Sequence, residues 1–220
     1  MTAVDPTEDT ADHTEAITMG LHDASPPDLV EVMAKDVELE MGWGRLIFGQ
    51  TFAHADQLAE TLRQEAPGRR DICIYARESH VVVAGSPSEL FIDPSHTYRL
   101  RFAGDDHEPA PAPPGITVRT LNDPADADAM NRVFVRCGMV PAPVDTIWNN
   151  HVNEPAVTYL IAVRDDDGAV VGTVTGVDHE VLFSDPECGS SLWTLAVDPA
   201  AGIPGVGEAL TRATAEHFRS

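Results

Sequence analysis

Apolar and polar positions follow regular patterns in two parts of the chain, and a proline-rich segment separates these parts. In the carboxyl-terminal part, alternation and β-branched runs predict strands, whereas apolar residues three and four positions apart predict helices. An acidic turn at Asp165–Gly168 predicts a hairpin. The elements expected here, in chain order, are a strand over 116–121, helices over 126–137 and 143–151, strands over 158–163 and over 169–177 continuing toward Leu182-Phe183, a strand within 189–199 and a helix over 208–218.

Shorter elements are expected in the amino-terminal part of the chain. Strand and helix patterns alternate there, which predicts a small α/β unit over residues 37–102. Its expected elements are a strand over 45–52, a helix over 55–65 that ends at Pro67-Gly68, strands over 71–76 and 80–84, a short helix over 86–90 and a strand over 98–102.

Two segments lack the apolar residues that a core requires. Residues 1–36 mix Asp, Glu, Thr and Pro, which predicts a disordered acidic tail because burial cannot offset the entropy of ordering. Residues 103–115 hold acids and four prolines, which predicts an extended linker. The remaining segment, 116–220, is then a second domain of mixed α/β class (α+β), with a mainly antiparallel sheet and flanking helices.

Composition indicates a soluble globular protein. Of the 220 residues, 43% are hydrophobic, enough to bury a core, and no apolar run approaches the about 18 to 20 residues that span a bilayer. The amino terminus has acids and turn formers in place of a basic and apolar signal, so we expect a cytoplasmic protein. Cys73, Cys137 and Cys188 form no Cys-x-x-Cys pair, which predicts free thiols and no metal site.

The formal net charge is -22, with one lysine beside thirteen arginines. Such a negative field repels phosphate backbones, so nucleic acid and an anionic membrane are excluded as partners. An acidic, lysine-poor surface is typical of proteins kept soluble in high salt. GC-rich codon usage explains the excess of arginine equally well.

The most specific chemistry lies in a glycine-rich loop between the last predicted strand and the last helix. The segment Gly202-Ile203-Pro204-Gly205-Val206-Gly207-Glu208 places small residues directly before a helix. Exposed backbone N–H groups and the positive end of the helix dipole then favour a phosphate. A Walker loop is excluded because Gly207 precedes Glu208 and Ala209, and a dinucleotide fingerprint is excluded because Leu210 replaces its third glycine.

The segments Leu195-Ala196-Val197-Asp198-Pro199 and Gly205-Val206-Gly207 resemble the coenzyme motif of GNAT acetyltransferases. The resemblance implies acetyl-CoA as cosubstrate. It also implies that the backbone of Leu195, Ala196 and Val197 binds the pantetheine arm and the thioester oxygen, while the loop and helix start bind the pyrophosphate. Two positions depart from the motif, since Gly202 replaces the usual Gln or Arg and Pro204 removes one N–H donor.

Separated blocks are similar to the amino-terminal region of the N-acetylglutaminylglutamine synthetases, which fuse an acetyltransferase to an ATP-grasp ligase. The resemblance covers roughly residues 37 to 218 and implies acetylation of the α-amine of glutamine, or of a related amino compound, in osmolyte biosynthesis. The blocks are 42–46, 66–72, 93–100, 172–179 and 189–193.

A GNAT domain normally continues beyond the helix that follows its glycine loop. The printed chain stops at Ser220, so we expect a carboxyl-terminally incomplete GNAT fold in which the proton donor to the leaving thiolate is unassigned. The alternative function is a non-catalytic folding or interaction module, in which an exposed sheet edge invites a partner or self-association.

Candidates for the general base lie where the strand over 169–177 ends, at Asp178, His179 and Glu180. An imidazole is the side chain best suited to accept an ammonium proton near neutrality, so His179 is the first of the three. A solvated turn is the other interpretation of such an acid-His-acid cluster.

Overall fold

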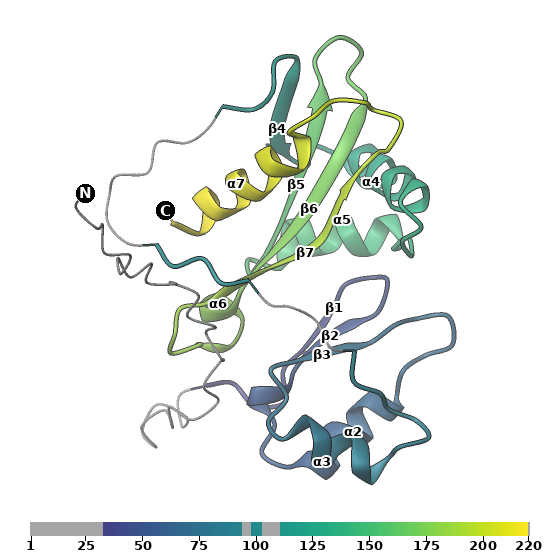
Figure 1. Ribbon diagram of the computed structural model, residues 1–220, viewed down its shortest axis with the longest axis vertical. Helices are drawn as coiled ribbons and strands as arrows, with labels where there is room; N and C mark the ends of the chain where they lie inside the picture. The colour runs from purple at the N-terminus through teal and green to yellow at the C-terminus, as the bar shows by residue number, and fades with distance from the viewer. Residues whose placement is uncertain (1–32, 94–97, 103–110, 220) are drawn as a thin grey trace, which may run out of the picture. The chain divides into compact units, whose positions relative to one another are not determined.

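The computed structural model describes residues 33–93, 98–102 and 111–219, and residues 33–220 belong to one compact unit. Its helices and strands, in chain order, are β1 Glu38–Glu40, β2 Arg45–Phe48, the 3-10 turn η1 Gly49–Thr51, α2 Ala55–Arg63, β3 Ile72–Ile74, α3 Ser79–Gly85, β4 Ile116–Thr120, α4 Pro124–Arg136, α5 Val144–Asn153, β5 Val157–Arg164, β6 Val170–Asp178, α6 His179–Phe183, β7 Ser190–Val197 and α7 Val206–Arg219 (Figure 1).

The larger sheet has four antiparallel strands in the order β4-β5-β6-β7. The sequence order of strand, two helices, three antiparallel strands, loop and helix is therefore confirmed, and the fold is α/β with flanking helices. One detail of the prediction is wrong. The run after Val177 does not continue as a strand toward Phe183, because Asp178 accepts the Val181 N–H at 3.0 Å and caps helix α6.

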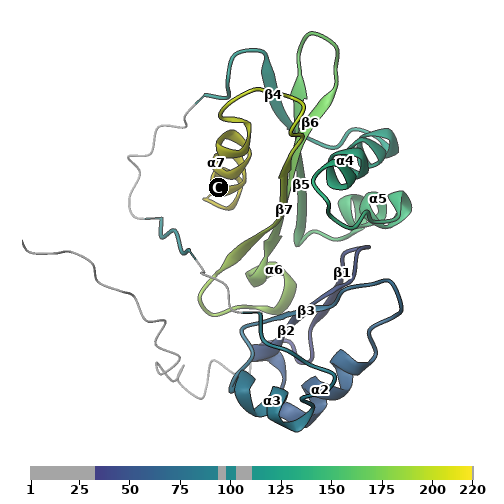
Figure 2. The ribbon, with the colours of Figure 1, turned by 45° about the vertical axis from the view of Figure 1, so that its right-hand side comes forward.

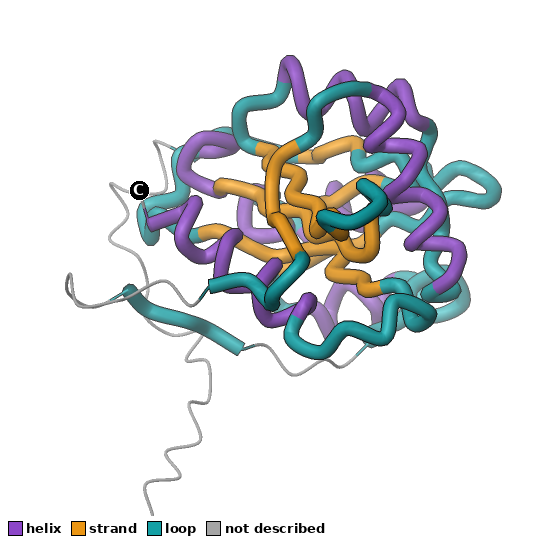
Figure 3. Tube along the Cα trace, turned by 90° about the horizontal axis from the view of Figure 1, so that it is seen from above, coloured by secondary structure: helices purple, strands orange, loops and turns teal. Residues whose placement is uncertain are grey.

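Helices cover both faces of this sheet, α7 on one side and α4 with α5 on the other (Figure 2). On the α7 side, Val174 packs with Leu210, and a Cβ placed on Gly172 would lie 2.9 Å from a methyl of Leu210. On the other side, Val177 packs with Met130 and its neighbours. The strands thus lie at the centre with helices around them, as the view from above shows (Figure 3).

The smaller sheet has the order β1-β2-β3, with β2 antiparallel to β1 and parallel to β3. Helices α2 and α3 pack against it through Ile47, Leu58 and Val82. The expected strand over 80–84 is wrong, since these residues belong to α3. Their β-branched run resembles a strand, but only Val82 is buried in the helix, so a single contact with the core decides the conformation.

Three further predictions for this part of the chain need correction. The strand expected over 45–52 ends at Phe48 and turns into η1. Residues 86–90 form turns where a helix was expected, and residues 98–102 have no regular structure. Exposed side chains explain the last case, because Tyr98, Leu100 and Phe102 do not pack on either sheet.

The hydrophobic core does not divide at the predicted linker over 103–115, of which residues 103–110 lie outside the described residues. Leu39, Trp43 and Phe48 of the amino-terminal part share one cluster with residues of the larger sheet. Residues 1–32 of the predicted tail also lie outside the described residues. Residues 33–36 differ from the prediction, since the Ala34 N–H donates to the carbonyl of Phe183 at 3.0 Å. Among the described residues, no helix has the length and apolar character needed to cross a membrane.

Candidate functional site

Strand β7 forms one edge of the larger sheet and contains a β-bulge. Trp193 pairs with Thr175 and Ala196 pairs with Thr173, so Thr194 and Leu195 together oppose Val174. Thr194 takes a left-handed backbone conformation, with φ of 48°, and its hydroxyl lies 2.7 Å from that of Thr175. Bulges turn the strand and interrupt its pairing, and they occur often beside binding sites.

The edge of β7 that faces away from β6 has no strand partner among the residues that the structure describes, and it is called the open edge of β7. The Asp198 N–H donates to the carbonyl of Val171 in β6 at 2.8 Å. Because backbone groups alternate along a strand, the N–H and carbonyl of Val197 point to the opposite side. The Cys137 thiol contacts that carbonyl at 3.2 Å. Of the predicted coenzyme residues, Val197 thus faces the open edge, the Leu195 side chain is exposed and Ala196 is buried.

The loop after β7 is held by the carboxylate of Asp198. This side chain is 8% exposed, receives the Ala200 N–H at 2.9 Å and forms an ion pair with Arg136. Two predicted ligand residues in the loop, Gly202 and Gly205, have φ of 64° and 87°, which only glycine adopts without strain. The loop therefore has a defined course from the edge of the sheet to the start of α7.

Helix α7 begins with free backbone donors. The N–H of Ala209 donates to the carbonyl of Gly205 at 2.9 Å, which is the first bond of the helix. The N–H groups of Val206, Gly207 and Glu208 precede that bond, so they have no partner within the helix. Gly207 lies beside β7, since a Cβ placed on it would lie 3.6 Å from a methyl of Val197. The structure thus brings the predicted loop residues next to the open edge of β7.

One carboxylate accompanies these donors. Glu208 stands in the first turn of α7 and its side chain accepts from Arg212 at 2.9 Å. The pair leaves no net charge of its own, so the helix dipole remains the main field at this point. This arrangement is compatible with an anion held by backbone N–H groups alone.

The three predicted base candidates do not form a cluster. Asp178 caps α6, Glu180 is exposed, and His179 is 3% exposed. The ring of His179 instead meets two residues that the sequence analysis missed. Its Nε2 lies 2.8 Å from Oγ of Ser191, and its Nδ1 lies 3.8 Å from a carboxylate oxygen of Asp185. Neither contact has a sequence signal, because both depend on how the loop after α6 folds back.

Asp185 is kept ionised in spite of its surroundings. Burial alone would raise the pKa of the Asp185 carboxyl, but His179 and two backbone N–H groups outweigh that effect and lower it. The N–H donors belong to Gly189 at 3.0 Å and to Glu187 at 3.3 Å. Asp185 therefore presents a negative charge to the imidazole at neutral pH.

No group of three or more His, Cys, Asp or Glu side chains suited to a metal ion occurs among the residues that the structure describes. The cysteines of that part are free thiols, and burial raises the pKa of Cys73 to about 11.

A comparison with protein-family models finds no match, and no curated protein matches the sequence. Similar solved structures include an acetyltransferase from Trypanosoma brucei, with a TM-score of 0.38 and 16% identity over 47% of this chain and 75% of that one. A GCN5-related N-acetyltransferase from Sphaerobacter thermophilus has a TM-score of 0.39 and 22% identity, over 52% of this chain and 36% of that one.

A third similar structure is a GNAT family acetyltransferase from Brucella melitensis in complex with acetyl-CoA. Its TM-score is 0.36 and its identity 18%, over 47% of this chain and 68% of that chain. All three TM-scores lie below 0.5. The more specific resemblance to the N-acetylglutaminylglutamine synthetases stays a prediction.

Proposed function

We propose that this chain binds acetyl-CoA and transfers the acetyl group to an amine, as GNAT acetyltransferases do. The observation that carries the proposal is the continuous path over residues 194–209. A bulged edge strand with outward backbone groups leads through a fixed glycine loop to three free N–H groups at the start of α7. An extended ligand with phosphates at one end and amides along its arm fits such a path.

Each part of acetyl-CoA has a counterpart in this path. The N–H groups of Val206, Gly207 and Glu208 would bind the pyrophosphate. The outward N–H and carbonyl of Val197 would pair with an amide of the pantetheine arm, as one strand pairs with another. The bulge at Thr194 and Leu195 would lie beside the thioester, where a backbone donor polarises the carbonyl that the amine attacks.

For the acceptor we propose the α-amine of glutamine or of a related amino compound, in the biosynthesis of an N-acetylglutaminylglutamine osmolyte. This choice rests on the resemblance of the sequence blocks to the synthetases. The negative net charge favours a small amine over nucleic acid as the partner, because a negative field attracts a cationic amine and repels a phosphate backbone. We also propose a cytoplasmic location.

The phosphate contact is best tested at Gly207. Gly205 is a poor choice because its φ of 87° makes any side chain strained, whereas a Cβ on Gly207 meets only an ordinary contact at 3.6 Å. Gly207→Asp adds a charge and Gly207→Asn adds the same volume without it. Like charges about 4 Å apart repel by about 1 to 4 kcal/mol. We therefore expect calorimetry to show at least about fivefold weaker acetyl-CoA binding for Gly207→Asp than for Gly207→Asn.

A second ligand separates this contact from the rest of the site. S-acetylpantetheine lacks the nucleotide and its pyrophosphate, so its affinity should be the same in the two variants. No binding of acetyl-CoA to the unaltered protein at millimolar concentration would refute the proposed function. Equal affinity of both variants for acetyl-CoA would place the phosphates elsewhere.

The open edge of β7 also favours a second candidate, a protein-interaction module. Leu192 and Leu195 on this strand are 39% and 46% exposed, and an unpaired edge with apolar side chains attracts another strand. In that case light scattering should show a dimer or larger species, and Leu195→Lys should return it to the monomer. A monomer at all concentrations would exclude self-association.

A further inference from the structure

A continuous chain of polar contacts connects the loop after α6 with the first residues of β7. The Asp185 carboxylate lies 3.8 Å from Nδ1 of His179, and Nε2 of the same ring lies 2.8 Å from Oγ of Ser191. The indole Nε1 of Trp193 donates to that Oγ at 2.7 Å. The backbone holds the chain in place, since the His179 N–H donates to the carbonyl of Gly189 at 2.9 Å.

The ring of His179 is buried, and its nitrogens make their polar contacts with Ser191 and Asp185. The imidazole is 3% exposed and packs among aromatic rings, with centroid distances of 5.2 Å to Phe48, 5.4 Å to Phe183 and 6.0 Å to Tyr75. No substrate reaches a ring enclosed in this way. Ser191 is partly exposed, so His179 exchanges a proton with a substrate through the hydroxyl of Ser191.

The contacts determine which ring nitrogen carries the proton. An indole N–H only donates, so the Trp193 contact uses a lone pair of Ser191 and leaves the hydroxyl hydrogen for Nε2 of His179. An ionised carboxylate only accepts, so Asp185 selects the tautomer with hydrogen on Nδ1. His179 therefore accepts at Nε2 and faces Asp185 with an N–H.

Other charged groups near the ring do not reverse this assignment. Glu187 forms an ion pair with Arg99 at 3.1 Å. Tyr75 is neutral near pH 7, because burial raises the pKa of its hydroxyl. On α6, the Asp178 carboxylate is engaged in capping the helix and Glu180 is exposed. The net charge that faces the ring is that of Asp185.

We propose that Ser191, His179 and Asp185 form a proton relay that receives the proton lost by the acceptor amine. The ammonium N–H bond breaks and an O–H bond forms on Ser191, while the former hydroxyl hydrogen of Ser191 moves to Nε2 of His179. The neutral amine then attacks the thioester carbonyl, so that a C–N bond forms and the C–S bond breaks, and the proton that the amine nitrogen still has to lose passes to the departing coenzyme thiolate. The imidazolium is paired with Asp185. The inference rests on the proposed acetyl transfer, and it assigns roles to Ser191 and Asp185 in place of Asp178 and Glu180.

The position of Ser191 on β7 suits this role. It precedes the bulge at Thr194 by three residues, or about 10 Å of extended strand. A single bridging water joins heavy atoms only about 5 to 6 Å apart, so a row of two or three ordered waters would connect the amine with the Ser191 hydroxyl. Ser191 and His179 are thus positioning and proton-accepting groups at the start of the strand whose bulge would hold the thioester.

Kinetics with acetyl-CoA and glutamine test the relay. Ser191→Ala should lower kcat by about 100-fold, the usual size of a general base effect, with unchanged acetyl-CoA affinity by calorimetry. Ser191→Thr keeps the hydroxyl and should recover most of the rate. The control is Ser190→Ala at the exposed neighbouring position, which should behave as the unaltered protein. A Ser191→Ala enzyme with more than half of the original kcat, or a Thr variant as slow as the Ala variant, would overturn the relay.

Nitrogen NMR of histidine-labelled protein gives a readout that does not depend on turnover. The relay requires a bare Nε2 and a protonated Nδ1 in the neutral ring of His179. A proton on Nε2 would overturn it, because Ser191 would then be the acceptor. An unaltered protein that neither binds nor uses acetyl-CoA would refute the acetyltransferase proposal, whereas an active protein indifferent to Ser191→Ala would refute the relay alone.

Discussion

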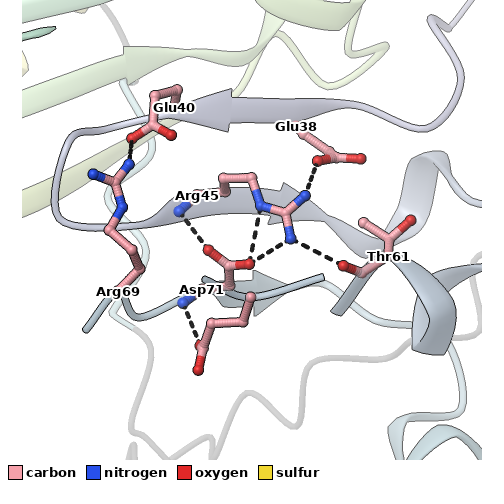
Figure 4. Close-up of polar contacts among 7 residues, drawn as sticks. Glu38, Glu40, Arg45, Thr61, Arg69 and Asp71 are labelled. Atoms are coloured by element: carbon pink, nitrogen blue, oxygen red, sulfur yellow. Dashed lines mark hydrogen bonds and ion pairs between the residues drawn. The ribbon is translucent and has the colours of Figure 1, made fainter. Parts of the chain in front are cut away.

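Two polar regions of the molecule use their donors in opposite ways. Around Arg45, every part of the guanidinium has a partner within the protein (Figure 4). Nη1 contacts the carboxylate of Glu38 at 2.5 Å, Nη2 donates to the Thr61 carbonyl at 2.9 Å, and Nε donates to the carboxylate of Asp71 at 2.9 Å. At the start of α7, three N–H groups precede the first bond of the helix and lie beside an open strand edge.

This difference separates a structural cluster from the proposed binding site. The Asp71 side chain is only 3% exposed, and its second carboxylate oxygen accepts from the backbone N–H of Arg45 at 2.8 Å. The pair therefore joins β2 to β3 and to α2. Satisfied groups in such a cluster gain nothing from a ligand, since binding would break contacts already made. Free donors at a helix start gain a full set of hydrogen bonds, which is why we place the phosphates there.

The largest effect on stability is expected from Gly44→Ala, in the turn between β1 and β2 beside the Arg45 cluster. A Cβ on Gly44 would lie 1.8 Å from the carbonyl oxygen of Arg70, and no side chain is able to move aside because the obstacle is backbone. Gly44→Ala should therefore cost about 4 kcal/mol or more in the free energy of unfolding, measured with urea. Gly85→Ala is the matched control, because nothing lies within 4 Å of its Cβ.

We expect Gly85→Ala to be neutral or to stabilise α3 by up to about 1 kcal/mol, since alanine is the better helix former. Equal stability of the two variants would show that β1, β2 and the segment before β3 do not pack as described. That result would also remove the basis for treating Arg45 as a structural residue.

Asp71→Ala addresses the Arg45 cluster itself. The change leaves a largely buried guanidinium without its main partner and should cost about 3 kcal/mol of unfolding free energy. Glu60→Ala breaks an ion pair with Arg63 whose side chains are 68% and 37% exposed, and should have little effect on stability because water screens the pair. Both variants should keep the acetyl-CoA affinity of the unaltered protein at temperatures where they are folded. A loss of affinity in Asp71→Ala alone would make the cluster part of the binding site.

The sequence predicts the larger sheet well because its elements are long and its patterns are unambiguous. Strands such as β5 and β6, buried on both faces, read as continuous runs, and the residues around Gly205 mark the loop. The amino-terminal part is predicted less well. Its elements are as short as three residues, as in β1 and β3, so packing decides them more than local preference does.

The site shows the same division between local and distant information. Backbone donors at Val206 to Glu208 follow from a local strand, loop and helix pattern, which is why the sequence predicts them. The contacts of His179 with Asp185 and Ser191 join residues six and twelve positions away across a turn of irregular backbone. Ser184 and Cys188 in that turn have φ of 59° and 48°, conformations that no glycine marks in the sequence.

The ion pair between Arg119 and Asp126 is intermediate in exposure, and its effect on the free energy of unfolding should depend on pH. Asp126 in α4 accepts from Arg119 at 2.7 and 3.0 Å, and their side chains are 12% and 30% exposed. The guanidinium of Arg119 holds the pKa of the Asp126 carboxyl below its ordinary value of about 3.8. A carboxyl with a lowered folded-state pKa stabilises the protein above its unfolded pKa, and this stabilisation disappears as pH falls through the folded value.

Asp126→Asn keeps the shape of the side chain and removes the charge. It should cost about 1 kcal/mol of unfolding free energy at pH 7, less than the buried Asp71 pair because water screens the contact. The unfolded carboxyl becomes protonated near pH 3.8 and the folded one only at the lower folded-state pKa, so the two proteins should approach equal stability as pH falls through that lower value. Urea titrations at pH 7, 4 and 2.5 measure the difference. If the difference in unfolding free energy stayed constant with pH, the shape of the Asp126 side chain and not its charge would account for its stabilising effect. The same explanation would then apply to Asp71.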